Sequence, residues 1–297
     1  MTKRNKEKLV TLIFLLIVLG FIYLFDYLNN TYSINKKDIT PVDGEIMIQF
    51  IDVGEADSSL VSLNDKYMLI DAGNNNDGEL LSTYLKSMNI KKLDYLINTH
   101  PHEDHIGGMD NIINNFQIDK YLMINTKVNN KTYKEVIKSL NKNNVKYEVP
   151  LIDSSFNLDN CKIDILSIKD DKENLNDSSI VLKLSYGKIR VLFMADASYN
   201  VEHELLNKDI KSDVLRVGHH GSSYSTSANF LYRVHPKYSI ISVGKDNEYY
   251  HPHKVTLDKL NRINSKVYRT DLDGTIIMTS DGENINFKTI KTYTDGG

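Results

Sequence analysis

The chain has 297 residues, of which 41% are hydrophobic and 25% are charged, and its formal net charge at pH 7 is −3. This composition is typical of a globular protein that forms one large domain or two small ones. Because the net charge is not positive, tight and sequence-independent binding of duplex nucleic acid is not indicated. The single cysteine, Cys161, excludes a disulfide within the chain.

The first 28 residues have the pattern of a membrane anchor. Basic residues within 1–8 precede an apolar run, residues 9–25, that contains no charge. A helix over residues 9–28, at about 1.5 Å per residue, is long enough to cross a hydrocarbon core of roughly 30 Å. We therefore expect a cytoplasmic basic tail (1–8) and a single transmembrane helix (9–28). The positive-inside rule then predicts that the remaining chain is extracytoplasmic and that the protein lies in the cell membrane.

A cleaved signal peptide is the alternative for the same segment, and it would make the protein secreted. The apolar run is longer than the core of a usual signal peptide, and no Ala-x-Ala-like cleavage site follows it. An uncleaved anchor is therefore the favoured interpretation.

Residues 29–44 are polar, contain Pro41 and Gly44 and lack an apolar period, which predicts a linker. A folded domain is expected over residues 45–290, followed by a short tail at 291–297. Its predicted strands are 46–51, 59–63, 67–70, 93–97, 120–124, 145–149, 163–168, 179–185, 188–195, 214–217, 239–243, near 267, 275–279 and 284–287. Its predicted helices are 77–88, 109–116, 131–141, 201–206, 227–233 and 253–263. Two mixed sheets with helices outside both, an αββα sandwich of the α/β class, fit this order.

A histidine-rich loop follows the predicted strand 93–97. Within six residues it supplies His100, His102, Asp104 and His105. Imidazole and carboxylate ligands suit zinc, and also manganese or iron. The side chains of His100 and His102 would point the same way in an extended segment, so the other two must face a second direction. That geometry suggests two adjacent metal ions; the competing interpretation is a polar loop that caps a strand end.

Two later segments add candidate ligands. Asp196 ends the strand 188–195 and would emerge at the sheet edge; alternatively, it caps the helix that follows. His219 and His220 follow the strand 214–217, and adjacent residues of an extended chain point to opposite sides. We expect His220 to bind a metal and His219 to contact substrate, although the reverse assignment is open. Ser222, in the same segment, is expected to contact substrate.

His251 lies in the loop after the strand 239–243. It could bind a phosphoryl oxygen, protonate a leaving group or ligate a metal, and the alternative is a solvated loop histidine. His253 is better explained as a loop residue without a catalytic role.

The spacing His-x-His-x-Asp-His is the signature of the metallo-β-lactamase fold superfamily, which this sequence resembles at every signature position. Together, residues 50–57, 99–108 and 217–222 look like its ComEC-type branch. That branch includes the nuclease domain of the DNA-uptake (competence) channel and a relative that cleaves phosphorylcholine from cell-wall teichoic acid. The resemblance covers roughly residues 45–290 and does not extend to the channel itself.

The resemblance implies a site for two divalent metal ions, zinc or else manganese. In the superfamily, the carboxylate at the position of Asp196 bridges both ions. The implied ligands of the first ion are His100, His102 and Asp196, and those of the second are Asp104, His105, Asp196 and His220. Asp57 and Asp71 would orient ligating histidines, or alternatively cap turns.

The sequence departs from the family pattern at two places. Glu55 and Ala56 stand where the family usually has Gln and Gly. Many members also carry another histidine between the first motif and the bridging aspartate, whereas no histidine occurs between Ile106 and Tyr199. The first ion would therefore stay open to water or substrate, and a β-lactam hydrolase is disfavoured.

These features predict a membrane-anchored metal-dependent hydrolase that uses a metal-bridging hydroxide. The expected substrate is a phosphodiester in DNA or a cell-wall polymer, and no stable protein partner is expected. The alternatives are a metallohydrolase of another ester, lactone or thioester, and a non-catalytic DNA- or wall-binding accessory protein. The Asp-x-Asp-Gly-Thr sequence at 271–275 resembles the nucleophile motif of haloacid-dehalogenase phosphatases, but its Asp-Gly pair is better explained as a hairpin turn between two strands.

Overall fold

The computed structural model describes residues 15, 18–20 and 39–291. One compact unit covers Thr40–Lys291. The basic tail and most of the membrane helix and linker predicted from the sequence lie outside the described residues, as does most of the C-terminal tail. In the part of the chain that the structure describes, we find no helix with the length and apolar character needed to cross a membrane.

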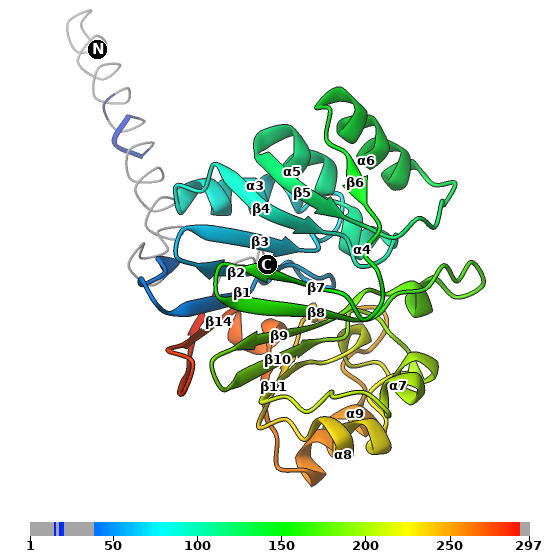
Figure 1. Cartoon of the computed structure of the whole chain (residues 1–297). Coiled ribbons are helices and arrows are strands. Elements are labelled where there is room, and N and C mark those ends of the chain that lie inside the picture. Colours follow the sequence, from blue (N-terminus) through cyan, green and yellow to red (C-terminus); the bar gives the residue numbers. More distant parts are fainter. Residues whose placement is uncertain (1–14, 16–17, 21–38, 292–297) are drawn as a thin grey trace, which may run out of the picture. The chain divides into compact units, whose positions relative to one another are not determined.

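The unit contains two sheets that face each other (Figure 1). The strands of the first sheet are β1 (Ile46–Phe50), β2 (Ser59–Leu63), β3 (Lys66–Ile70), β4 (Lys92–Ile97), β5 (Gln117–Leu122), β6 (Tyr147–Glu148), β14 (Thr275–Ser280) and β15 (Ile285–Ile290). Those of the second are β7 (Ser155–Leu158), β8 (Cys161–Ser167), β9 (Val181–Tyr186), β10 (Ile189–Phe193), β11 (Val214–Arg216), β12 (Tyr238–Ile241) and β13 (Lys266–Arg269). The spatial orders are β15-β14-β1-β2-β3-β4-β5-β6 and β13-β12-β11-β10-β9-β8-β7.

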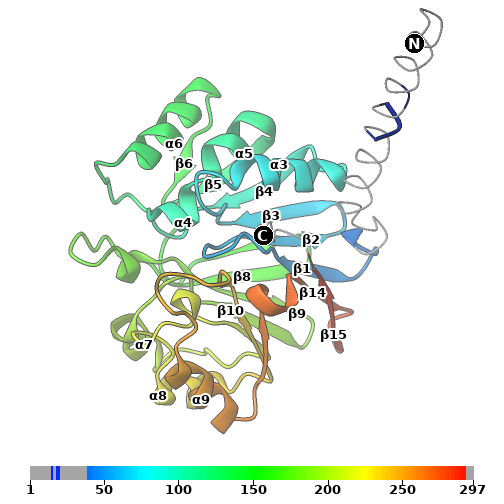
Figure 2. The same ribbon diagram turned by 180° about the vertical axis from the view of Figure 1, so that it is seen from behind.

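Helices cover the outer face of each sheet, as Figures 1 and 2 show from opposite sides. The first sheet carries α3 (Gly78–Ser87), α5 (Met109–Asn115) and α6 (Lys131–Lys142). The second carries α7 (Tyr199–Leu205), α8 (Ala228–Val234) and α9 (Lys254–Arg262). The predicted mixed α/β architecture with two sheets is confirmed.

The two sheets are held together by an apolar core whose residues follow the two-residue period of the strands. In β1, Ile46, Ile48 and Phe50 contribute to this core, whereas Gln49 on the other face accepts a hydrogen bond from Tyr84 of α3. Phe50 stacks on Phe193 of β10 with ring centroids 5.9 Å apart. Because this contact joins the two sheets, it fixes the positions of the loops that leave both of them.

A second core lies between the second sheet and its helices. Leu192 and Met194 pack there with Phe230 and Val234 of α8. The central strands β10, β11 and β12 are therefore buried on both faces, and they pair in parallel. Parallel strands end at the same edge of the sheet, so the loops after these three strands emerge side by side.

Five short elements were not predicted from the sequence. They are β7, the helical turn α4 (Glu103–Ile106), the 3₁₀ turns η1 (Leu175–Ser178) and η2 (His219–Gly221), and the helical turn α10 (Thr270–Asp273). The hairpin predicted within residues 271–275 is wrong. The flanking strands β13 and β14 belong to different sheets, and α10 together with Gly274, at φ +71°, connects them.

Gly107 ends α4 at a position where the fold leaves no room for a side chain. A Cβ at this position would lie 2.1 Å from the backbone of Asn74 and Asn75, which no side-chain movement can relieve. We expect Gly107→Ala to lower the free energy of unfolding by about 3 kcal/mol, the upper range for overpacking. In Gly218→Ala the nearest atom to the new Cβ is the Ala197 carbonyl oxygen at 3.3 Å, so a smaller loss is expected. Equal midpoints for the two variants in urea unfolding would contradict this assignment.

Candidate metal centre

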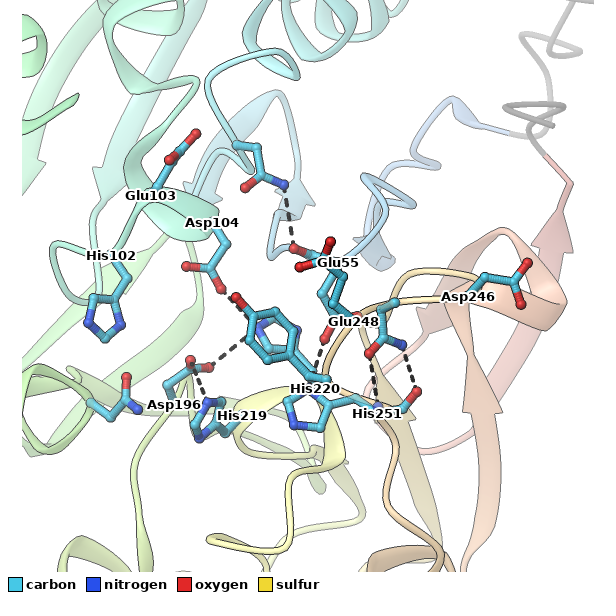
Figure 3. Close-up of a pocket in the computed structure, with 14 residues that line it drawn as sticks. Glu55, His102, Glu103, Asp104, Asp196, His219, His220, Asp246, Glu248 and His251 are labelled. Atoms are coloured by element: carbon cyan, nitrogen blue, oxygen red, sulfur yellow. Dashed lines mark hydrogen bonds and ion pairs between the residues drawn. The ribbon is translucent and has the colours of Figure 1, made fainter. Parts of the chain in front are cut away.

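The candidate site lies where strands of both sheets end. The His100 loop follows β4 of the first sheet, whereas Asp196, His220 and His251 follow β10, β11 and β12 of the second. This is the edge formed by the carboxyl ends of parallel strands, where α/β sheets collect their ligands. A cavity of about 610 Å³ opens at this edge. Figure 3 shows His102 and Asp104, from the loop after β4, opposite Asp196 and His220.

The first group of candidate ligands is His100, His102 and Asp196. Their ligand atoms all lie within 4.8 Å of one another. His100 Nε2 is 3.0 Å from His102 Nδ1 and 3.9 Å from Asp196 Oδ2. Two nitrogens that ligate one tetrahedral zinc at about 2.0 Å lie roughly 3.3 Å apart, so the two rings are placed as ligands of one ion would be.

The second group surrounds the other oxygen of Asp196. Asp196 Oδ1 is 3.3 Å from His105 Nε2 and 3.8 Å from His220 Nε2. Asp104 Oδ2 approaches the same two nitrogens, at 3.6 Å from His105 Nε2 and 3.2 Å from His220 Nε2. The Asp196 carboxylate thus presents one oxygen to each group, which is the geometry of a bridging ligand.

Asp57 also reaches the second group. One of its oxygens lies within 4.8 Å of ligand atoms of His105, Asp196 and His220, although the sequence assigned it an orienting role. However, Asp57 forms an ion pair with the buried Arg216, and its oxygen is 3.7 Å from His105 Nδ1 rather than Nε2. Because His105 Nδ1 already bonds to Asp71, Asp104 is better placed than Asp57 to complete this group.

Buried partners orient the rings of the second group. Asp71 Oδ2 lies 2.8 Å from His105 Nδ1, and the same carboxylate accepts hydrogen bonds from the amide and hydroxyl of Thr99 at 2.9 and 2.7 Å. His220 Nδ1 lies 2.9 Å from the carbonyl oxygen of Ser242. Both rings therefore direct Nε2 toward Asp196, as is usual for histidine ligands held by a second hydrogen bond.

The backbone around His219 and His220 differs from the extended chain assumed from the sequence. Both residues have left-handed backbone conformations, at φ +51° and +50°. As a result both rings line the cavity instead of pointing to opposite sides. His220 joins the second group, and His219 Nε2 lies 3.7 Å from Asp196 Oδ2.

His251 lines the cavity, and Glu55 orients it. Its Nδ1 lies 2.8 Å from Glu55 Oε1, while Glu55 Oε2 accepts a hydrogen bond from the amide of Gly244 at 2.7 Å. The carboxylate at the position where the family usually has glutamine therefore supports a cavity histidine. His253 lies behind the cavity and accepts a hydrogen bond from the amide of Ser223.

Ser222 is not brought to the cavity. Its side chain is buried, and its hydroxyl accepts a hydrogen bond from the amide of Tyr224. Every other residue of the predicted site either lines the cavity or lies directly behind its ligands. The asparagine Asn176, which the sequence did not single out, also lines the cavity.

The electrostatics of the site depend on its burial. Burial lowers the pKa of His100 well below its ordinary value, with a contribution from His105. For His105, burial acts in the same direction, but the carboxylates of Asp196, Asp104 and Asp71 outweigh it and raise the pKa well above 6.5. The pKa of His220 is raised to about 9, because Asp196 and Asp104 outweigh the effect of burial.

Two buried atoms of the site lack a well-oriented hydrogen bond, and they show whether a metal ion would fit there. His105 Nε2 and Asp196 Oδ1 are buried and, although they lie 3.3 Å apart, neither forms a well-oriented hydrogen bond with a described residue. Each buried polar atom left unsatisfied costs about 1–3 kcal/mol. A divalent cation between the two groups would satisfy both atoms, and a set of imidazoles and carboxylates suits zinc, manganese or iron. The residues present therefore fit the metal ions that the sequence predicts.

The fold and the site together define an α/β protein with two facing sheets and a candidate binuclear metal centre at their common edge. Residues 51–245 match the family model of the metallo-beta-lactamase superfamily, and the chain belongs to this superfamily. The resemblance noted in the sequence is thereby confirmed.

Two curated relatives are similar to this chain over most of its length. The chain is 32% identical over 255 residues to ComE operon protein 3 of Bacillus subtilis, covering 79% of this chain and 33% of that protein. It is 28% identical over 235 residues to Recombination protein 2 of Haemophilus influenzae, covering 77% of this chain and 28% of that protein. The chain thus spans a third or less of the length of these curated relatives.

Solved structures share the fold at low sequence identity. The metallo-beta-lactamase fold protein YhfI from Bacillus subtilis aligns with a TM-score of 0.55 and 13% identity, over 80% of this chain and 99% of that chain. CmlA, a diiron beta-hydroxylase from Streptomyces venezuelae, aligns with a TM-score of 0.53 and 13% identity, over 84% of this chain and 55% of that chain. At these identities the likeness establishes the fold alone.

Metal binding is expected to release protons. Because their pKa values are raised, His105 and His220 are protonated at pH 7 in the metal-free protein, and only neutral imidazole binds a cation. We expect about two protons to be released per protein at pH 7, and the affinity of the second group to rise between pH 7 and pH 9. Calorimetric zinc titrations in buffers of different ionisation enthalpy measure this number. Absence of proton release at pH 7 would contradict the protonation states assigned here.

Asp71 is expected to affect metal affinity without being a ligand. Asp71→Asn removes the charge that orients His105, so we expect the affinity of the second group for zinc to fall 10- to 100-fold, the usual cost of losing such a partner. Asp94→Asn is the matched control, because Asp94 pairs with Lys66 and Lys92 away from the cavity. Equal zinc affinities for the two variants would count against the orienting role.

Proposed function

We propose that this protein is a metal-dependent hydrolase of phosphodiester bonds. The observation that carries the proposal is the bridging position of Asp196, whose two oxygens face two separate groups of histidines. When bound, a pair of divalent cations supplies an activated water and stabilises the charge that develops in an in-line displacement. His100, His102 and Asp196 would hold one cation, and Asp104, His105, Asp196 and His220 the other.

The remaining cavity histidines are assigned to the substrate. His219 Nδ1 is buried and has no hydrogen-bond partner among the described residues, so it is available to a phosphoryl oxygen. Glu55 holds His251 through Nδ1, which leaves Nε2 to face the substrate and to protonate the leaving oxygen. Neither role requires a protein nucleophile.

The relatives' names refer to recombination and competence, which favours a nucleic-acid context. They include Competence protein ComA of Neisseria gonorrhoeae, 34% identical over 111 residues. We therefore propose a phosphodiester of DNA or of a cell-wall polymer as the substrate. An N-terminal anchor at residues 9–28, with the hydrolase domain outside the cytoplasm, is part of the same proposal.

The full-length protein, loaded with zinc or manganese, tests this function directly. We expect hydrolysis of bis(p-nitrophenyl) phosphate to exceed that of p-nitrophenyl acetate and of a chromogenic β-lactam. His102→Ala should lower kcat by more than about 100-fold, because loss of a ligand costs more than loss of a residue that only orients one. His203→Ala is the control, since His203 is exposed on α7.

Three outcomes would count against the proposal. Turnover in His102→Ala equal to wild type would remove this site as the origin of activity. Preference for the carboxylic ester would favour the alternative of a metallohydrolase of another bond. Binding of DNA or wall polymer without hydrolysis of any ester would favour an accessory protein.

A further inference from the structure

Asn176 has a buried carboxamide oxygen that the fold leaves unused. The residue belongs to the 3₁₀ turn η1 and lines the same cavity as His102 and Asp196. Its Oδ1 is buried and has no hydrogen-bond partner among the residues that the structure describes. An unsatisfied buried oxygen costs about 1–3 kcal/mol, and because Asn176 lines the cavity, a ligand bound there could supply the missing partner.

The turn is fixed to both chain segments that supply the first group. The amide of Ile180 donates to the carbonyl of Thr99 at 3.0 Å, directly before His100. On the other side, the hydroxyl of Ser179 accepts a hydrogen bond from the amide of Asp196 at 3.2 Å. These contacts place η1 between the His100 loop and the end of β10.

The turn is also held from within and from α7. The side chain of Asn174 accepts a hydrogen bond from the amide of Asn176 at 3.3 Å. Asp177 accepts from the amide of Ser198 at 3.3 Å and from the side chain of Asn200 at 3.1 Å. Five hydrogen bonds from three directions thus hold the backbone that carries Asn176, whereas its own side-chain oxygen is left for the cavity.

The first group also has fewer ligands than the second. It contains His100, His102 and Asp196, and the chain has no histidine between Ile106 and Tyr199 to add a third imidazole. Side-chain amide oxygens are established ligands of divalent cations in proteins. We propose that Oδ1 of Asn176 is a ligand of the cation held by this first group. This inference rests on the proposed metal-dependent function.

The donor type has a consequence for metal preference. Carbonyl oxygens suit hard cations such as manganese, whereas imidazole suits zinc. If Asn176 completes the first group, the preference of this group for zinc over manganese is weak. A histidine at the same position would make that preference stronger.

The first site can be measured alone in a His220→Ala background, which removes a ligand of the second group only. We titrate the metal-stripped full chain with zinc and with manganese against a chromogenic chelator. Asn176→Ala should lower the zinc affinity of the first site about 10- to 100-fold. Asn176→Asp should keep it, because it keeps the oxygen, and Asn176→His should raise the ratio of zinc affinity to manganese affinity at least about 10-fold.

Asn74→Ala is the matched control. Asn74 is another cavity carboxamide, but its side chain donates to the carbonyl of Glu55, so its replacement should leave both affinities unchanged. Thermal unfolding of each metal-free variant separates loss of a ligand from loss of the fold. If Asn176→Ala does not fold, the aspartate and histidine variants still decide the question, because each fills the same position.

The proposal is overturned if Asn176→Ala binds zinc as wild type does and Asn176→His leaves the ratio unchanged. A variant that changes KM alone, at unchanged metal affinity, would make Asn176 a substrate contact and also overturns it. The proposed function can be refuted independently of this ligand assignment. A protein whose metal affinity depends on Asn176, but which hydrolyses no ester, would refute the hydrolase and leave this ligand assigned.

Discussion

The contact between the two sheets is the constraint on which the site depends. Neither sheet carries a complete group of ligands, because His100 and His105 leave the first sheet and Asp196 and His220 leave the second. The stacking of Phe50 on Phe193 and the apolar residues around it set the spacing of the two strand edges. A core that is close-packed transmits small changes in volume, so its exact filling determines distances between ligands that lie at its rim.

The cost of this arrangement is a set of buried ionisable side chains. Asp71, Asp196, His100 and His105 are each at most 2% exposed. Removing charges from water costs several kcal/mol per ion unless close partners compensate. Nearby partners compensate part of the cost of burying these charges. Asp71 accepts two hydrogen bonds from Thr99, and Asp57 pairs with Arg216. His105 Nε2 and Asp196 Oδ1 are among the buried atoms that have no hydrogen-bond partner in the described residues, and a cation bound between the two groups would contact both of them.

The sequence predicts much of the fold because its strands keep regular periods. The alternation in β1 and the apolar runs of β10 to β12 identify buried strands without further information. The histidine and aspartate positions follow from residue type and spacing, since few other roles explain three histidines in one loop. The hairpin predicted within residues 271–275 was wrong because an Asp-Gly pair also fits the end of a helical turn, and local sequence does not reveal which sheet the next strand joins.

Other features of the site depend on contacts that no local pattern contains. The left-handed backbone of His219 and His220 is imposed by the tight turn η2 (His219–Gly221) between β11 and α8, so the rule for extended chains did not apply. Asp57 was expected to orient a histidine through the family resemblance alone, and Asn176 was not singled out. Contacts between distant segments bring Asp57 close to His105 and place Asn176 in the cavity lining. The missing histidine between Ile106 and Tyr199 predicted only that the first ion would stay open to water or substrate, and it did not point to Asn176.

The charge of the cavity links metal loading to substrate binding. Its lining includes six carboxylates, Glu55, Glu103, Asp104, Asp196, Asp246 and Glu248, and no lysine or arginine. Within such a lining a phosphate group would meet like charges; Glu103, Asp246 and Glu248 are exposed to solvent, whereas Asp196 is buried, where repulsion is least screened. Two divalent cations would reverse the local sign where Asp104 and Asp196 lie, because a bound ion is the largest charge in such a site. Under the proposed function, the acidic lining therefore makes phosphodiester binding depend on the bound metals.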